Sequence, residues 1–334
     1  MERVTIDDLA ARLGLSRASV SYALNGRPGV AEETRVRVLD LARELGWQPS
    51  VSARSLSRSR ADAFGIVLNR RPEDLGSEPY YMGLLSGIES RLSDAGTSLM
   101  IRFVTNVDSE AAVYRRWTAE RRVDGVILTD LRIDDPRPAL LEELSLPYLV
   151  HSGQLTERGW HFDNDREAAI LVDHLAELGH TRIAHISGPT SLLHETERRQ
   201  AVLVDAEEHH MKAVIVEGDY SLDGAHDLTA GLLRRRAAPT AIIYSNDLMA
   251  VGGLSAVREA GRDGVSIVSW DDSLLCRTAS PGITALQRDP YQAGLRTATK
   301  LLETVRKPGD AAIYPVEARP SHLVVRESSH PVDR

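Results

Sequence analysis

The sequence has a single cysteine, Cys276, and only three lysines, none of them before residue 200. One thiol cannot form an internal disulfide or a thiolate metal cluster, which is typical of a protein from a reducing compartment. No apolar run approaches the roughly 20 residues that span a bilayer, and the stretch MERVTIDDLAARL carries acids where a signal peptide needs an apolar core. We therefore expect a cytoplasmic protein without membrane contact, in which Cys276 is an inert, small apolar side chain.

Several motifs of catalytic sites are missing as well. The sequence has no GxGxxG after its first predicted strand, no Walker GxxxxGK[ST], no HExxH and no GxSxG. Asp271 and Asp272 could form an acid/base pair, but adjacent side chains at a strand end point to opposite faces. The pair His209-His210 lies in a charged helix tail, where solvated side chains are more common than metal ligands. We expect no catalytic residue, no metal and no cofactor, and therefore no enzyme.

The charge is unevenly distributed along the 334 residues, a length that predicts two or three domains. Residues 1–60 hold ten arginines and seven acidic residues, whereas the rest of the chain holds 30 basic and 41 acidic residues. A small basic module is thus attached to an acidic body that repels phosphate. Any DNA contact should be confined to this module, where every cation is an arginine, with a planar fork that suits phosphates and guanine edges.

Three short helices are predicted in the basic module. Thr5 is the N-cap of the first helix, with Asp8 at its third position and Gly14 at its end. Ser16 is the N-cap of the second helix, which ends before Asn25-Gly26. The third helix runs from about Glu32 to Leu45, and we expect four of its residues to face inward: Val36, Leu39, Leu41 and Ala42.

The acidic body starts at Phe64 with short apolar runs that alternate with helical patterns. The runs are FGIVL, SLMIRF, DGVILT, PYLVH, RIAHIS, KAVIVE, TAIIYS and VSIVSW. Such alternation predicts α/β structure, with parallel sheets covered by helices, which could form one wide sheet, a closed barrel or two smaller sheets. A polar interruption at residues 151–167 favours two lobes, with crossovers there, near residues 287–289 and near residues 318–320.

Several segments carry a resemblance to a known family. The stretch VTIDDLAARLGLSRASVSYALNG from Val4, followed by VAEETRVRVLDLARELGWQPSVSARSL, strongly resembles the N-terminal domain of the LacI/GalR family of bacterial transcription regulators. The likeness continues in order through EPYY, VDGVIL, DND, HLAELGHTRIAHISGP, YSNDLMA and SWDD. The resemblance implies a helix-turn-helix headpiece, a hinge helix and a two-lobed body like a periplasmic binding protein.

The resemblance places the DNA contacts in the headpiece and the hinge. The second helix would enter the major groove, with Arg17, Ala18 and Tyr22 reading bases and Ser16, Ser19 and Ser21 near phosphates. In the Ser/Arg-rich segment at residues 50–57 the minor-groove contacts would come from Ala53, Arg54 and Leu56, with Leu56 as a wedge that kinks the DNA. The alternatives are a three-helix interaction module with a solvated arginine face, and a Leu56 that packs on the body.

The resemblance also implies a small-molecule site between the lobes, most often for a sugar. Its residues would be Tyr80, Tyr81, Thr129, Asp163, Arg198, Tyr220, Asn246, Asp271 and Arg288. Asp271 and Arg198 suit pairs of vicinal hydroxyls, Asn246 offers one donor and one acceptor, and Tyr220 offers a flat face to a pyranose. For each residue the alternative is a structural ion pair or a core aromatic.

The sequence as a whole is identified as a DNA-binding repressor controlled by an effector. We expect a headpiece at residues 1–49, a hinge at 50–60 and an effector-binding and dimerisation body at 61–334. The N-lobe would comprise 61–160 and 289–318, and the C-lobe 161–288 and 319–330. Its partners would be a palindromic operator, a sugar and a second copy of the chain. The alternatives are a cytoplasmic sugar-binding protein and a sugar-modifying enzyme on the same fold.

Overall fold

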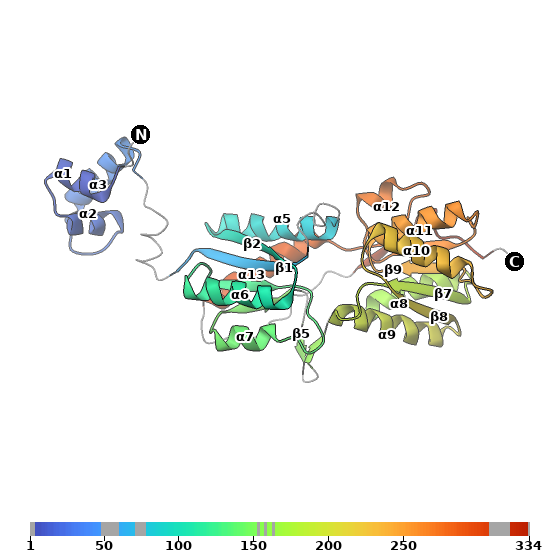
Figure 1. The fold of residues 1–334 in the computed structure, drawn as a ribbon. Helices are drawn as coiled ribbons and strands as arrows, with labels where there is room; N and C mark the ends of the chain where they lie inside the picture. Colours follow the sequence, from blue (N-terminus) through green and yellow to red (C-terminus); the bar gives the residue numbers. More distant parts are fainter. Residues whose placement is uncertain are drawn as a thin grey trace. The chain divides into compact units, whose positions relative to one another are not determined.

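The computed structural model describes residues 4–47, 60–70, 78–151, 154–156, 159–161, 164–306 and 321–332. The chain divides into two compact units, Met1–Arg60 and Ala61–Arg334, and Figure 1 gives the order of their helices and strands. Four of the expected site residues lie outside the described part of the chain: Ala53, Arg54, Leu56 and Asp163.

The first unit is a bundle of the three helices predicted from the sequence. They are α1 (Ile6–Leu13), α2 (Arg17–Leu24) and α3 (Glu32–Glu44). Thr5 and Asp8 form a reciprocal capping box at the start of α1, and Gly14 ends it with φ of +66°. The Ser16 hydroxyl caps α2 by accepting from the Ser19 N–H at 3.1 Å. These expected helix boundaries are confirmed.

The core of the bundle corrects one expectation about α3. Leu9, Val20 and Val38 are fully buried, and Ala42 lies beside them. Ala42 thus faces inward as expected and Leu41 packs against the cluster, but Val36 and Leu39 are 48% and 39% exposed. The prediction that Val36 and Leu39 face inward is therefore wrong. Val38 and Ala42, four residues apart, share the core-facing side of the helix, whereas Val36 and Leu39 lie on another side.

The second unit begins with a parallel sheet in the order β2-β1-β3-β4. Its elements are β1 (Ala63–Asn69), α5 (Pro79–Asp94), β2 (Ser98–Val104), α6 (Val107–Ala119), β3 (Gly125–Leu128), α7 (Arg137–Glu143) and β4 (Tyr148–Val150). Ile66 and Leu68 pack with residues of α5, while Val67, between them, packs with residues of α6 and α7. α5 and α6 lie on opposite faces of this sheet (Figure 1). We call this sheet with its helices the N-lobe.

The second sheet has the order β12-β11-β10-β9-β7-β8 and is parallel except for β12. Its strands are β7 (Arg182–Ser187), β8 (Lys212–Glu217), β9 (Ala241–Tyr244), β10 (Ser266–Ser269), β11 (Thr284–Gln287) and β12 (His322–Val324). Its helices are α8 (Asp165–Glu177), α9 (Leu193–Glu208), α10 (Leu222–Leu233), α11 (Asp247–Glu259) and α12 (Leu274–Thr278). α8 and α9 cover one face, and α10, α11 and α12 cover the other. We call this sheet with its helices the C-lobe.

All eight apolar runs form strands, so the expected α/β class with parallel sheets is confirmed. Inside the polar interruption the chain forms a hairpin that the sequence pattern did not predict, of β5 (Gln154–Thr156) and β6 (Gly159–His161).

The chain returns to the N-lobe after β11, where α13 (Pro290–Arg306) packs along α5. Glycines permit this close crossing. A Cβ at Gly87 would lie 2.0 Å from the carbonyl oxygen of Tyr291, and a Cβ at Gly294 would lie 2.3 Å from that of Leu84. The N-lobe is therefore completed by a helix that follows most of the C-lobe in sequence.

Candidate functional site

The exposed side of α2 carries the three residues expected to read bases. Arg17, Ala18 and Tyr22 are exposed, while Val20 and Ala23 of the same helix are buried in the core of the bundle. The Arg17 guanidinium lies 3.6 Å from the Asp7 carboxylate of α1, with both side chains largely in solvent. A surface pair of this kind contributes little, so Arg17 is available for another partner.

The three serines expected near phosphates lie along the same helix. The hydroxyls of Ser16 and Ser19 are 2.9 Å apart, and Ser21 accepts at its carbonyl from the Asn25 amide at 2.8 Å. Ser16 is exposed and the other two are half-buried. Their contact with phosphates stays a prediction.

In the second unit, the expected effector residues follow the carboxyl ends of parallel strands. Thr129 follows β3, Tyr220 comes after β8, Asn246 after β9, Asp271 after β10 and Arg288 after β11. Side chains at this edge of an α/β sheet are the usual ligand contacts. Tyr80 and Tyr81 lie at the start of α5, and Arg198 lies on α9.

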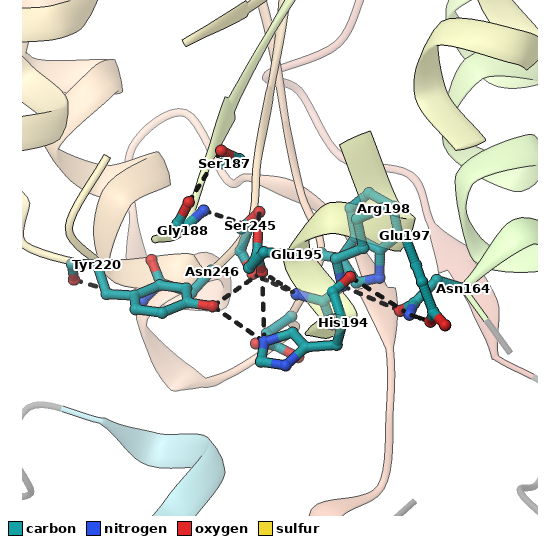
Figure 2. A network of polar contacts seen from close by, with 12 residues as sticks. Asn164, Ser187, Gly188, His194, Glu195, Glu197, Arg198, Tyr220, Ser245 and Asn246 are labelled. Atoms are coloured by element: carbon teal, nitrogen blue, oxygen red, sulfur yellow. Dashed lines mark hydrogen bonds and ion pairs between the residues drawn. The ribbon is translucent and has the colours of Figure 1, made fainter. Parts of the chain in front are cut away.

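Glu195, which the sequence analysis did not select, lies at the centre of a cluster of polar side chains in the C-lobe (Figure 2). Its side chain is fully buried and accepts four hydrogen bonds. Oε1 accepts from Arg198 and from the Tyr220 hydroxyl, each at 2.9 Å. Oε2 accepts from the Ser245 hydroxyl and the Gly188 N–H, each at 2.7 Å. This carboxylate holds two of the expected site residues in place.

Tyr220 is held in an unusual backbone conformation, with φ of +64°. Bulky residues rarely adopt this region, and such strain is concentrated at functional sites. A Cβ at position 188 would lie 2.2 Å from the Tyr220 ring, so Gly188 is required for the ring to lie where it does. The hydroxyl is also 3.1 Å from Nε2 of His194, and the carbonyl accepts from Asn246 at 3.4 Å.

The buried charges of this cluster are balanced. Burial raises the pKa of Glu195, but the Arg198 guanidinium and the nearby histidines outweigh it and bring the pKa to about 2. Burial, followed by the Glu195 charge, holds the pKa of Tyr220 well above its usual value. Glu195 is therefore an anion at neutral pH, and Tyr220 is a neutral donor.

A second cluster surrounds Arg288. Its Nη1 lies 3.1 Å from Oδ1 of Asp271, and its Nε lies 3.5 Å from Oε1 of Glu167 on α8. The guanidinium stacks 5.0 Å from the centre of the Tyr80 ring, so Arg288 connects C-lobe carboxylates with an N-lobe aromatic. The Tyr80 hydroxyl in turn lies 3.0 Å from Nε2 of His151, which follows β4.

A third cluster lies in the N-lobe around Tyr81. The Arg70 guanidinium stacks 4.0 Å from the centre of its ring and lies 2.5 Å from the Asp130 carboxylate. The Tyr81 hydroxyl bonds to the side chains of Asp130 and Thr129. Burial raises the pKa of Asp130, but Arg70 and then His194 of the C-lobe hold it below its usual value. Asp130, like Tyr220, is a non-glycine residue with positive φ, here +50°.

Direct contacts join these clusters. Arg198 stacks 4.7 Å from the centre of the Trp270 ring, and the Trp270 indole N–H donates to Glu167 at 2.7 Å. The loops after β3 and β7 also meet as a short antiparallel bridge. In this bridge the Leu193 N–H donates to the Leu131 carbonyl at 2.8 Å and the Ile133 N–H donates to the Ser191 carbonyl at 3.2 Å. We call the three clusters together the interlobe site.

The structure thus brings together eight of the nine expected effector residues; the ninth, Asp163, is outside the described part. Sequence reasoning missed several of their partners: Asp130, His151, His194, Glu195, Glu167 and Trp270. One signal was available, because Glu195 and Arg198 are three residues apart on a helix and can pair. The others come from distant segments, and spacing gives no sign of such contacts.

The described residues show no group of side chains arranged to hold a metal ion. Among them, no helix is both long and apolar enough to span a membrane. Cys276 is buried, and burial raises the pKa of its thiol to about 12, as suits an unreactive side chain.

Comparisons with known proteins find matches to both units of the chain. Residues 5–50 match the family model of bacterial regulatory proteins of the lacI family, and residues 172–329 match that of the periplasmic binding protein-like domain. The chain is 30% identical to the HTH-type transcriptional regulator CelR of Thermobifida fusca over 98% of each chain. It is 32% identical to the regulator AglR of Rhizobium meliloti over 98% of this chain and 95% of that one.

Among solved structures, a complex of the transcriptional regulator CelR with cellobiose matches with a TM-score of 0.71 and 26% identity. The match covers 98% of this chain and all of that one. The helix-turn-helix unit and the two-lobed body are therefore those of the relatives, in the same order along the chain. The protein belongs to the lacI family and is a DNA-binding transcriptional regulator.

Proposed function

We propose that the protein is a repressor that binds a palindromic operator as a homodimer in the cytoplasm, and that a sugar bound in the interlobe site changes its operator affinity. The observation that carries this proposal is the gathering of eight expected effector residues in the interlobe site, five of them just after the carboxyl ends of parallel strands. A ligand bound there contacts both lobes and can change their relative arrangement, which is the property an allosteric effector needs.

The chemistry of the site suits a sugar. Asp271 and Arg198 can each bind two vicinal hydroxyls, Asn246 offers a donor and an acceptor, and the tyrosines offer ring faces to the apolar side of a pyranose. The relative whose structure matches over nearly the full chain was solved with cellobiose, a disaccharide. We include Asp163 among the contacts because the family resemblance implies it.

The DNA contacts of the proposal lie in the first unit and the segment after it. Arg17, Ala18 and Tyr22 read base edges from α2, Ser16, Ser19 and Ser21 bind phosphates, and the minor groove is contacted by Ala53, Arg54 and Leu56. One headpiece reads too few base pairs for useful specificity, so two headpieces related by a twofold axis are needed. We propose the predicted boundaries for this organisation: 1–49, 50–60 and the two lobes of 61–334.

Two other functions remain as alternatives. A sugar-binding protein without a DNA function is disfavoured by the first unit and by the family to which the chain belongs. A sugar-modifying enzyme is disfavoured because the matched relatives are regulators and the sequence has none of the four catalytic motifs named above. Turnover of a bound sugar, measured by product analysis, would favour the enzyme.

The test has two steps. In the first step, a panel of carbohydrates is screened by thermal shift to find the sugars that bind. In the second step, the operator is selected from random DNA, and the protein is titrated with it by fluorescence anisotropy with and without each bound sugar. We expect a palindromic motif, an affinity that falls steeply with salt because arginine–phosphate contacts release counterions, and a change in affinity when the sugar is added. A flat salt dependence would contradict DNA binding by the arginine-rich module. A sugar that binds without changing operator affinity would contradict control by the effector.

A further inference from the structure

We infer that the effector is an uncharged sugar and that the interlobe site rejects phosphorylated and acidic sugars. This inference rests on the proposed function, since it concerns the ligand of the same site. The observation behind it is that every arginine of the three clusters is already paired with a carboxylate inside the protein. Among the described residues of these clusters, an anionic ligand therefore meets no arginine that lacks a carboxylate partner.

Of the three arginines, Arg198 has the most varied set of partners. Only 5% of it is exposed, and its Nη1 lies 2.9 Å from the Glu195 carboxylate. Its Nε donates to Asn164 at 3.1 Å, its Nη1 also reaches the Ser245 carbonyl at 3.4 Å, and its face lies on Trp270. A phosphate that took this Nη1 for itself would separate it from a buried carboxylate.

The other two arginines each have two acidic partners. Arg288 lies between Asp271 and Glu167, at 3.1 and 3.5 Å. Arg70 pairs with Asp130 at 2.5 Å and with Glu78. In the three clusters, three guanidiniums therefore face five carboxylates.

The pKa directions favour the charged form for most carboxyls of the site, although burial raises the pKa of Asp271. Burial raises the pKa values of Glu195 and Glu167, but neighbouring arginines outweigh burial and hold both below their usual range. Burial also lowers the pKa of His151 to about 3 and lowers that of His194. Near neutral pH His151 adds no positive charge to offset the carboxylates.

Neutral and anionic ligands have different effects on these buried ion pairs. A hydroxyl can insert between an arginine and its carboxylate as both donor and acceptor, so both charges stay compensated. A phosphate or carboxylate of the ligand takes the arginine for itself and leaves a buried carboxylate unpaired, which is strongly unfavourable. Rejection of anions is therefore a result of the protein's own pairing and not of missing space.

The experiment compares each neutral sugar with anionic analogues that keep its pyranose ring. Each neutral sugar of the panel is titrated by calorimetry beside these analogues, for example glucose with glucuronate and glucose 6-phosphate. We expect the anionic member of the binding pair to bind about ten-fold more weakly or worse. An anionic analogue that binds as tightly as its neutral partner overturns the charge inference but leaves the proposed function intact. If no sugar of either kind binds, both are overturned.

A variant that removes one negative charge tests whether the carboxylates of the site cause the rejection of anionic sugars. Glu167→Gln keeps an acceptor for the Trp270 indole but removes one negative charge beside Arg288. We expect the ratio of neutral to anionic affinity to fall several-fold. Glu259→Gln, at an exposed residue of α11 outside the site, removes the same charge and should leave the ratio unchanged. Asp271→Asn serves as a second variant if Glu167→Gln fails to fold, and an unchanged ratio in a folded variant overturns the inference.

Discussion

At the scale of single residues, the interlobe site has a strained conformation on each side. Tyr220 and Asp130 have φ values of +64° and +50°, and each such conformation costs a non-glycine residue about 1–3 kcal/mol. Tyr220 is held by its bond to Glu195, and Asp130 by its pair with Arg70. These partners offset the strain and leave both side chains preorganised for a ligand.

Asp271→Asn tests the residue proposed to hold a pair of sugar hydroxyls. The change keeps the shape of the side chain but removes the charge that pairs with Arg288 at 3.1 Å. Loss of a charge-assisted hydrogen bond costs about 1.5–3 kcal/mol, so the affinity for the effector should fall ten-fold or more while operator binding without effector persists. Calorimetry with the sugar found by screening measures the loss. Asp263→Asn, at an exposed carboxylate of the same lobe, is the control, and equal affinity in both variants would remove Asp271 from the site.

Arg17→Ala tests base reading by α2. The exposed guanidinium can bind a guanine edge with two hydrogen bonds, and its loss should cost about 1–3 kcal/mol at one position in each half-site. Selection from random DNA should return a motif relaxed at that position. Arg12→Ala, in the last turn of α1, should keep the wild-type motif. Identical motifs for wild type and Arg17→Ala would show that another residue reads the base.

At the scale of secondary-structure elements, the sequence predicted more of the fold than of the site. The eight strands were predictable because parallel strands covered by helices are short apolar runs, even in β2 and β8 at the sheet edges, which are only partly buried. The helix caps were predictable because Thr5 and Ser16 precede apolar patterns. The inward face of α3 was mispredicted because Val36 and Leu39 are apolar but exposed. The bridge between the loops after β3 and β7 was not predictable, because it consists of backbone groups about 60 residues apart in sequence.

Leu193→Pro tests this bridge. Leu193 is the first residue of α9, a position where proline is favoured because its N–H has no partner within the helix. The substitution removes the donor to the Leu131 carbonyl and should leave α9 intact, so contact between the lobes weakens by about 0.5–1.5 kcal/mol. Hydrogen exchange of residues 131–133 should accelerate at unchanged circular dichroism. Leu193→Ala, which keeps the N–H, should exchange like the wild type; faster exchange in both variants would attribute the effect to the lost side chain.

At the scale of the whole molecule, the body buries titratable groups in both lobes. Burial lowers the pKa of His151 to about 3 and that of His185 to about 4, so both are neutral in the folded protein well below pH 6. Burial has the opposite effect on the carboxyl of Asp247, whose pKa it raises to about 6. Burial also lowers the pKa of His180 to about 4 and raises that of Asp205 to about 6, so three such histidines outnumber two such carboxyls and the effect of the histidines should dominate below neutral pH.

The free energy of unfolding should therefore fall as the pH is lowered from about 6.5 to 4. The unfolded chain takes up protons on these histidines in this range and the folded chain largely does not, which gives at most ~1.4 kcal/mol per pH unit for each histidine, reduced by Asp205 and Asp247. Urea unfolding at a series of pH values measures the slope. His185→Gln should flatten it, whereas substitution of the exposed His322 should not. A stability that does not change over this range would contradict the neutral, buried state of these histidines.

The order of the elements along the chain has a consequence for synthesis. α13 completes the N-lobe and β12 completes the sheet of the C-lobe, yet both are made only after residue 289. While the ribosome is still translating the earlier codons, α5 has no helix to cover it and β11 remains an open edge. A premature stop codon before that point leaves both lobes unfinished, and neither lobe can be expressed as one continuous fragment.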